Sequence, residues 1–164
     1  MLLLDAVVQK AEGVVALARE RKISLSCAES CTGGLVGAAI TSVAGSSEVF
    51  QGGIISYSND VKHRILGVDQ RILDTYGAVS EECARAMAQG ASRVLKTQVA
   101  ISITGIAGPD GGVPGKPVGT VWFGIATPHK VSAKLCTFNG SREMVRTNSV
   151  LQALDLLGEA MHSL

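Results

Sequence analysis

Residues 27–37 read CAESCTGGLVG, and this stretch gives the first indication of the fold. An apolar segment stops at Glu29 and Ser30, two glycines follow, and a helix-like pattern begins at Leu35. This order is typical of a buried strand that turns sharply into a helix. Such a turn exposes its side chains and leaves the first backbone N–H groups unpaired, which suits an anion or the oxyanion of acyl transfer. Ser30 therefore lies where a nucleophile would be useful.

On both sides of this turn, helix-like and strand-like segments alternate along the chain. The predicted helices cover residues 4–21, 35–40, 61–66, 81–96 and 141–161, and the predicted strands cover residues 23–28, 53–57, 99–103, 118–126 and 131–138. The short polar side chains of Ser58, Asn59 and Asp60 are expected to cap the helix that follows them, and the Ser80 hydroxyl is expected to cap the next one. The last two strands form a hairpin that turns at Pro128 and His129. We expect an α/β fold in one domain over residues 1–164, a three-layer α/β/α sandwich with a mixed, mostly parallel sheet.

The charge balance argues against a nucleic-acid partner. The 164 residues include 15 basic and 14 acidic side chains, which give a net charge of +1, and no block of Lys and Arg stands out. Aromatic residues make up only 4% of the chain, too few for a platform on which bases stack.

The cysteines and histidines do not follow the spacing of a metal site. Cysteines stand at positions 27, 31, 83 and 136 and histidines at 63, 129 and 162. We expect no metal and no other cofactor, and reduced thiols in a cytoplasmic protein. No run of about 18 apolar residues indicates a membrane span, and the apolar start Met1-Leu-Leu-Leu is too short for a signal peptide.

A long glycine-rich loop is predicted between two strands, over residues 105–117. It holds five of the 19 glycines and three of the four prolines. A connection of this length is more often functional than idle. It does not form a nucleotide-binding P-loop, because Asp110 and Pro117 replace the required glycine and hydroxyl residue. The dinucleotide motif is similarly incomplete at residues 32–37, where Thr32 replaces the first glycine and no acidic residue follows about 20 positions later.

For several candidate site residues, the sequence allows a purely structural role as well as a functional one. Ser30 can be a helix cap, and Cys31 can be a small buried apolar residue as well as a nucleophile. Lys62 is by default solvated, but burial beside Ser30 would favour a neutral amine that acts as a general base. Tyr57 is expected to be half-buried or to point into a cleft, and Thr104 is a turn residue or a ligand donor.

The roles of three charged residues also remain open at the level of sequence. Arg142 and Arg146 lie one helical turn apart, where they can pair with carboxylates or hold a phosphate together. Glu29 can orient a cation or cap backbone groups.

The chain resembles the CinA C-terminal domain family, whose stand-alone form is a nicotinamide-nucleotide amidase. The resemblance covers nearly the whole chain in the order of the family. The matching segments are Ala28-Glu-Ser-Cys-Thr-Gly-Gly34, Ala44-Gly-Ser-Ser47 with Phe50, Gly53, Tyr57-Ser-Asn59 with Lys62, Gly77-Ala-Val-Ser-Glu81, Thr104-Gly-Ile-Ala-Gly-Pro-Asp-Gly-Gly112 and Lys116-Pro-Val-Gly-Thr-Val121.

The resemblance implies hydrolysis of nicotinamide mononucleotide to nicotinate mononucleotide and ammonia, in pyridine nucleotide salvage. It implies Ser30 as nucleophile and Lys62 as its base, with Tyr57 and Thr104 in the catalytic pocket. The expected oxyanion donors are the N–H groups from Cys31 to Gly34. The substrate-binding residues that it implies are Glu29, Cys31, Thr32, Gly33, Gly34, Ser46, Gly105, Gly108 and Arg146.

Within this assignment, Arg146 suits the substrate phosphate, and Glu29 or Tyr57 can face the cationic pyridinium ring. The glycine loop is expected to close over the nucleotide. The apolar composition also suggests a homodimer.

Two alternatives remain at the level of sequence. The domain could be a non-catalytic module that binds a nucleotide or a protein partner in a competence or damage response. Cys31 could also replace Ser30 as the nucleophile.

Overall fold

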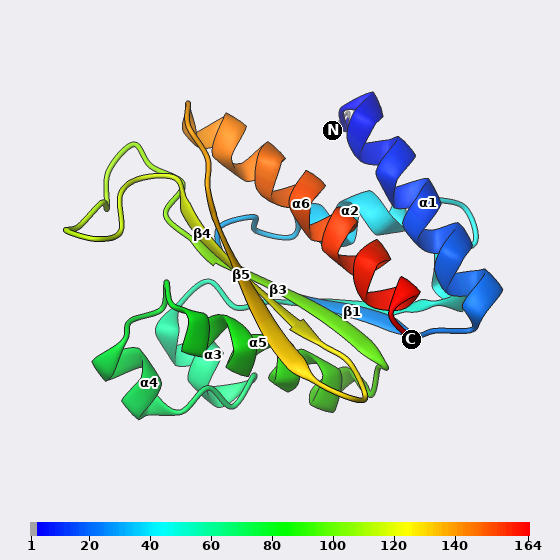
Figure 1. Cartoon of the computed structure of the whole chain (residues 1–164), viewed down its shortest axis with the longest axis horizontal. Coiled ribbons are helices and arrows are strands. Elements are labelled where there is room, and N and C mark those ends of the chain that lie inside the picture. Colours follow the sequence, from blue (N-terminus) through cyan, green and yellow to red (C-terminus); the bar gives the residue numbers. More distant parts are fainter. Residues whose placement is uncertain (1–2) are drawn as a thin grey trace.

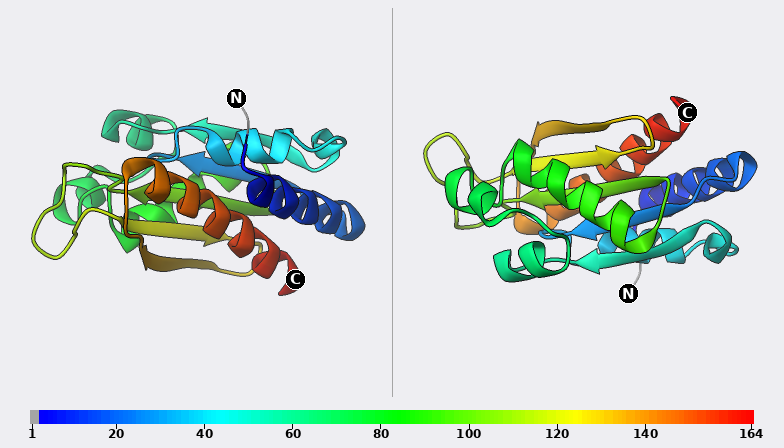
Figure 2. Two further views of the ribbon diagram at one scale, coloured as in Figure 1. Left: turned by 90° about the horizontal axis from the view of Figure 1, so that it is seen from above. Right: turned by 90° about the horizontal axis from the view of Figure 1, so that it is seen from below.

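The computed structural model describes residues 3–164, which form three layers with the sheet in the middle (Figure 1). This is the predicted α/β/α sandwich. One face of the sheet is covered by α1 (Asp5–Arg21), α2 (Leu35–Thr41) and α6 (Arg142–His162), and the other by α3 (Asn59–Arg64), α4 (Gln70–Thr75) and α5 (Glu81–Leu95). Views from above and below show the two helical layers separately (Figure 2).

The five-stranded sheet is mixed, as predicted. Its strands lie in the order β2 (Phe50–Ile55), β1 (Leu25–Glu29), β3 (Val99–Gly105), β4 (Thr120–Ala126) and β5 (Val131–Thr137). The first three strands are parallel, and β4 and β5 form the predicted antiparallel hairpin. The carboxyl ends of β1, β2 and β3 therefore meet at one edge of the sheet, where ligands bind in open α/β sheets.

The apolar core is divided by the sheet. One cluster lies beneath α1, α2 and α6, and a smaller cluster lies beneath α5. All five residues of β1 are buried, because the strand is central and covered on both faces. This burial explains why the segment before Ser30 is short and largely apolar.

Helix caps position the segments around the carboxyl edge of the parallel strands. As predicted, the Ser58 hydroxyl accepts from the Val61 N–H (3.2 Å) at the start of α3. The Ser80 hydroxyl likewise accepts from the Cys83 N–H (3.2 Å) at the start of α5. Each cap satisfies one backbone donor that the helix itself leaves unpaired.

The sequence patterns missed α4 and placed β2 three residues too late. Gly52 and Gly53 hide the start of β2, and Ser56 and Tyr57 lie beyond its end. The short helix α4 has too few residues for a clear apolar period, but Asp69 caps it by accepting from the Arg71 N–H (2.8 Å).

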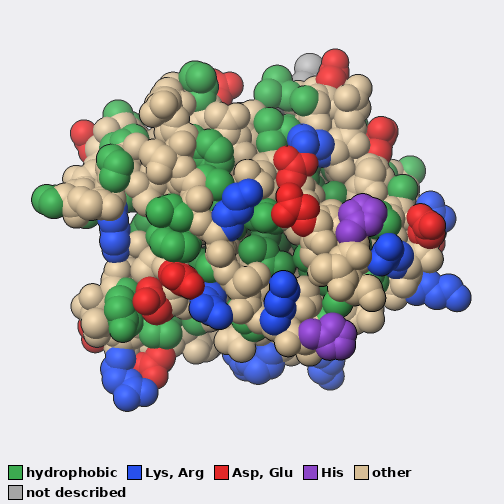
Figure 3. Space-filling model, in the orientation of Figure 1, with side chains coloured by type: hydrophobic (Ala, Val, Ile, Leu, Met, Phe, Trp, Pro, Cys, Tyr) green, Lys and Arg blue, Asp and Glu red, His purple; other side chains and the backbone are tan. Residues whose placement is uncertain are grey.

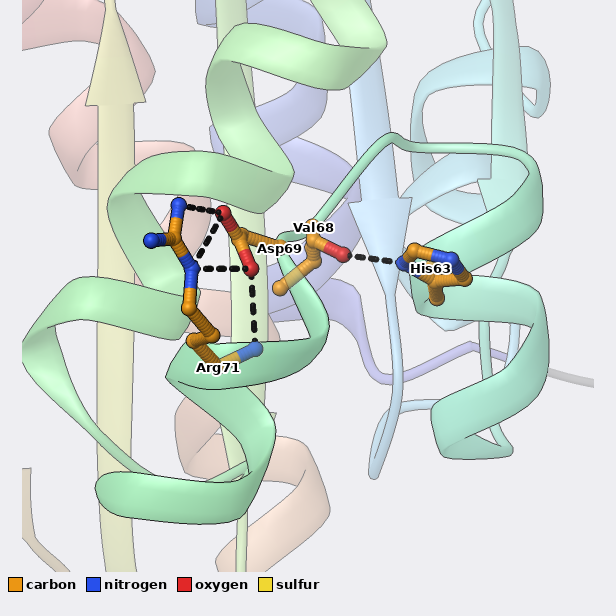
Figure 4. Close-up of polar contacts among 4 residues, drawn as sticks. All are labelled: His63, Val68, Asp69 and Arg71. Carbon is orange, nitrogen blue, oxygen red and sulfur yellow. Dashed lines mark hydrogen bonds and ion pairs between the residues drawn. The ribbon is translucent and has the colours of Figure 1, made fainter.

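Polar contacts also fix the connection between α3 and α4 (Figure 4). The Asp69 carboxylate binds the Arg71 guanidinium, and His63 Nδ1 lies 2.7 Å from the Val68 carbonyl oxygen. His63 therefore has a structural contact here.

Charged side chains of both signs are interspersed over the face of the molecule seen in Figure 3. No single-sign patch dominates that face. Among the residues that the structure describes, no helix is both long enough and apolar enough to span a bilayer.

A close approach between α5 and the turn after α3 fixes the position of α3. A Cβ atom on Gly90 would lie 2.1 Å from the Leu66 carbonyl oxygen. Any side chain at residue 90 would push this turn away from α5. Because α3 carries Lys62 and leads into this turn, the packing at Gly90 also affects the geometry of the site.

We predict opposite effects for alanine at two helical glycines. Gly90→Ala should lower the free energy of unfolding by about 1–3 kcal/mol, because the methyl group overlaps backbone atoms of Leu66. Gly13→Ala should raise it by about 0.5–1 kcal/mol, because nothing lies within 4 Å of the new atom and alanine favours the helix. Urea unfolding of both variants measures the two changes. A stability for Gly90→Ala equal to or above that of wild type would contradict the packing argument.

Candidate active site

Ser30 and Lys62 meet at the carboxyl edge of the parallel strands. Ser30 directly follows β1, and its N–H donates to the Ile103 carbonyl oxygen of β3 (2.9 Å). Lys62 extends from α3, and its Nζ lies 3.0 Å from Ser30 Oγ. Both side chains are buried, with exposed fractions of 8% for Ser30 and 1% for Lys62. The default expectation that Lys62 is solvated is wrong.

The contacts of the Lys62 amine are compatible with a neutral group. Its Nζ donates to the carbonyl oxygens of Ser56 (2.7 Å) and Tyr57 (3.1 Å). A neutral amine has two hydrogens for these carbonyls and one lone pair, which can accept the Ser30 hydroxyl proton. Burial lowers the pKa of Lys62 below its ordinary value, and within residues 3–164 no carboxylate pairs with it. The geometry and the charge environment thus both suit a general base.

The Glu29 side chain turns away from Ser30 and caps α2. It is 1% exposed, and its two oxygens accept from the N–H groups of Gly34 (3.0 Å), Val36 (3.1 Å) and Gly37 (2.9 Å). Of the two roles left open for Glu29, the structure thus shows capping. Its expected role in substrate binding is not supported, because the carboxylate is occupied within the protein.

Only two of the four expected oxyanion donors are free. The Gly33 N–H donates to the Ser30 carbonyl oxygen (3.1 Å), and the Gly34 N–H is taken by Glu29. Within the described part of the chain, the N–H groups of Cys31 and Thr32 have no acceptor. The expectation for Gly33 and Gly34 was wrong because their N–H groups build the turn itself. Both glycines have positive φ angles, +61° and +103°, which the turn requires.

The two arginines of α6 face different surroundings. Arg146 was expected near the substrate, but its Nε donates to the Cys31 carbonyl oxygen (3.1 Å) and its Nη2 to that of Thr32 (3.3 Å). Arg142 instead lines the cavity beside Ser30 and donates to the Gly108 carbonyl oxygen (2.8 Å). The spacing of one helical turn did not reveal which arginine reaches the cavity.

A cavity of about 190 Å³ opens beside the Ser30 hydroxyl. The expected site residues that line it are Ser30, Cys31, Tyr57, Lys62, Thr104 and Gly105, joined by Asn59, Ala78, Val79, Ala107 and Arg142. The Thr104 hydroxyl donates to the Ala78 carbonyl oxygen (2.8 Å), which ties β3 to the segment before α5.

Tyr57 is 63% exposed, more than the half-buried position expected for it. Its hydroxyl lies 3.4 Å from Arg142 Nη2. Sequence reasoning missed Asn59 as a site residue, although it belongs to the matching segment Tyr57-Ser-Asn59. Arg142 was expected to be able to hold a phosphate together with Arg146, but only Arg146 was expected near the substrate.

Three other expected substrate-binding residues do not line this cavity. Ser46 lies before β2, at the amino end of the parallel strands, whereas Ser30 follows the carboxyl end of β1. Thr32 is fully buried, and its hydroxyl has no partner within residues 3–164. Gly108 contributes its carbonyl oxygen to Arg142. The assignment of Ser46 was wrong because a loop at either end of a strand looks alike in sequence.

The Cys31 thiol is a poor candidate for the nucleophile. It is buried, and burial raises its pKa to about 11, although the nearby charges of Arg146 and Lys62 act in the opposite direction. A thiol with this pKa is almost entirely protonated near neutral pH. The residues that the structure describes also contain no cluster of His, Cys, Asp and Glu suited to a metal ion.

Comparisons with known proteins agree with this fold. The profile of the CinA C-terminal domain matches residues 8–161. A CinA-like protein of Thermotoga maritima is 47% identical over 146 residues, and one of Geotalea uraniireducens is 49% identical over 151 residues. The alignments cover 89% and 92% of this chain but only 36% of each relative.

Solved structures with the same fold cover nearly the whole chain. The competence/damage inducible protein CihA from Agrobacterium tumefaciens is 36% identical with a TM-score of 0.94, and the alignment covers 99% of each chain. A CinA superfamily protein from Klebsiella pneumoniae is 32% identical with a TM-score of 0.93, and the alignment covers 96% of this chain and 99% of that one. The chain thus belongs to the CinA C-terminal domain family.

Proposed function

We propose that this domain hydrolyses nicotinamide mononucleotide to nicotinate mononucleotide and ammonia. The observation that carries the proposal is the 3.0 Å contact between Ser30 Oγ and the buried amine of Lys62. A module that only binds a nucleotide or a protein partner needs neither group in this arrangement. The names of the relatives refer to competence and damage and state no reaction.

In the first half-reaction, Ser30 Oγ attacks the amide carbon while Lys62 Nζ takes the hydroxyl proton. The oxyanion of the tetrahedral intermediate accepts from the free N–H group of Cys31, a residue that lines the cavity. Lys62 then returns the proton to the leaving nitrogen, and ammonia departs from an acyl-enzyme. In the second half-reaction Lys62 deprotonates a water molecule, which attacks the ester carbon. The bond from this carbon to Ser30 Oγ then breaks, Lys62 returns the proton to Oγ, and nicotinate mononucleotide is released.

The size of the cavity supports a particular placement of the two ends of the proposed substrate. At about 190 Å³ it is smaller than pockets that enclose a whole drug-sized ligand, which have about 300–1,000 Å³. We therefore place the amide and the pyridinium ring inside and the ribose phosphate at the rim. There, the Arg142 guanidinium suits the phosphate, and the Tyr57 ring can face the cationic pyridinium.

The glycine-rich loop forms part of this rim. Its Gly108 carbonyl oxygen accepts from Arg142, and Lys116 Nζ donates to the Tyr76 carbonyl oxygen (2.6 Å). These contacts connect the loop to α6 and to the end of α4, which supports the expected closure over the nucleotide. We place the reaction in the cytoplasm, where the four free thiols would stay reduced.

Ammonia release from nicotinamide mononucleotide tests the proposed function. Wild type should turn the nucleotide over, and Ser30→Ala and Lys62→Ala should each lower kcat by at least about 10³-fold, because they remove the nucleophile and its base. Thr41→Ala, on the exposed end of α2, serves as a control for handling and folding. Absence of turnover by wild type would exclude the reaction. Undiminished turnover by Ser30→Ala would exclude the nucleophile.

The pH dependence of kcat/KM tests the protonation state of Lys62. Because the neutral amine is the active form, the rate should rise with pH as Lys62 loses its proton. Burial lowers the pKa of Lys62, so the midpoint should lie below that of an ordinary lysine. A rate that falls with pH through this range would contradict a lysine base.

Alkylation with iodoacetamide distinguishes Ser30 from Cys31 as the nucleophile. Near pH 7.5 the partly exposed Cys136 should react well before Cys31, which is buried and has a pKa of about 11. Mass spectrometry locates the adducts, and the modified protein should keep its activity while Cys31 stays unmodified. Rapid modification of Cys31 with parallel loss of activity, together with full activity of Ser30→Ala, would instead identify the thiol as the nucleophile.

A further inference from the structure

Arg146 binds the turn that carries the free oxyanion donors. Its guanidinium is half-buried and donates to the carbonyl oxygens of Cys31 (3.1 Å) and Thr32 (3.3 Å). It forms no ion pair with any carboxylate in residues 3–164. The guanidinium also lies close against the turn, since a Cβ atom on Gly33 would be 3.5 Å from Nη2. Its positive charge is therefore directed at two peptide groups.

Peptide geometry connects these carbonyl contacts to the donors. The Cys31 carbonyl and the Thr32 N–H belong to one planar trans peptide, so they point in opposite directions. When Arg146 holds the oxygen, the orientation of the Thr32 N–H is fixed as well.

The second contact of Arg146 stabilises the same turn. The Thr32 carbonyl shares its peptide with the Gly33 N–H, which donates to the Ser30 carbonyl oxygen (3.1 Å). Arg146 thus holds two successive peptides. The first carries the free Thr32 N–H, and the second carries the Gly33 N–H, which bonds back to the carbonyl oxygen of Ser30. Arg142 has no contact of this kind, because its partners are Gly108 and Tyr57 at the cavity rim.

We infer that Arg146 is a positioning residue: it holds the Cys31–Thr32 peptide and the turn after Ser30, and so keeps the nucleophile and the Cys31 N–H in the geometry that acyl transfer requires. In this arrangement Arg146 does not bind the substrate phosphate, and that contact falls to Arg142. The inference rests on the proposed amidase function. It distinguishes two arginines that lie one helical turn apart and that sequence cannot tell apart.

The test compares Arg146→Gln, Arg146→Lys and Arg142→Gln on two substrates. These are nicotinamide mononucleotide and the corresponding nucleoside, which lacks the phosphate. If Arg146 acts through the peptide, Arg146→Gln should lower kcat by about 10–100-fold on both substrates with little change in KM. Arg146→Lys keeps the charge and one donor and should recover part of this loss. Arg142→Gln should raise KM for the nucleotide and leave KM for the nucleoside unchanged.

A positioning role and a phosphate-binding role for Arg146 predict different changes in kcat and KM. A higher KM for the nucleotide alone in Arg146→Gln would identify Arg146 as a phosphate ligand and overturn the inference. An unchanged kcat in Arg146→Gln would overturn it as well. The pH midpoint of kcat/KM should stay at the wild-type value in both Arg146 variants, because the Lys62 environment is not altered.

A second readout does not depend on the natural substrate. A fluorophosphonate reacts with an activated serine: the Ser30 Oγ–P bond forms, the P–F bond breaks, fluoride leaves and the hydroxyl proton passes to Lys62. The phosphoryl oxygen of the adduct occupies the oxyanion position, so labelling of Ser30 should slow by about 10-fold or more in Arg146→Gln. Mass spectrometry measures the rate on folded protein, selected by its thermal unfolding transition.

This readout separates failure of the inference from failure of the proposed function. If wild type labels at Ser30 but releases no ammonia from the nucleotide, the substrate assignment fails, and slower labelling of Arg146→Gln still supports the role of Arg146. Equal labelling rates in wild type and Arg146→Gln would overturn that role. Absence of labelling at Ser30 in wild type would overturn both.

Discussion

The site depends on the buried Glu29 carboxylate at the junction of β1 and α2. Its two oxygens accept three backbone N–H groups, those of Gly34, Val36 and Gly37, so the start of α2 is held directly against the last residue of β1. A buried carboxylate needs such partners, because an unpaired charge in the interior is strongly unfavourable. One of these bonds occupies the N–H of Gly34, and the N–H of Gly33 bonds to the carbonyl oxygen of Ser30. The N–H groups of the turn that remain free are therefore those of Cys31 and Thr32, directly after Ser30.

A second constraint keeps the amine of Lys62 beside Ser30 without an anionic partner. The α3 cap at Ser58 and the contact between Gly90 and Leu66 position the helix that carries this lysine. Its hydrogens bond to two carbonyls, which satisfy them without adding charge. A nearby carboxylate would raise the pKa of the amine and keep it protonated. The hydrogen bonds between Glu29 and the start of α2 and the lowered pKa of Lys62 are therefore compatible features of one site.

Much of this arrangement could be predicted from local sequence patterns. The rest depends on which way individual side chains point in the folded protein. Buried strands, caps and the strand-to-helix turn at Ser30 have short-range signals, so the layers and the hairpin were predicted. The direction of a side chain has no such signal. Glu29 could face the cavity or the helix start, and Arg142 and Arg146 share one face of α6. Ser46 belongs to a matching segment, yet it lies at the opposite end of the parallel strands.

The absence of a carboxylate among the described residues of the cavity bears on the proposed cationic substrate. None of these residues is acidic, and the basic ones are Lys62 and Arg142. A carboxylate there would attract a pyridinium, but it would also favour the protonated form of Lys62 and weaken the base. An aromatic face attracts a cation without carrying a net charge. The exposed ring of Tyr57, whose own carbonyl oxygen accepts from Lys62 Nζ, therefore suits the cationic ring of the proposed substrate without raising the pKa of the proposed base.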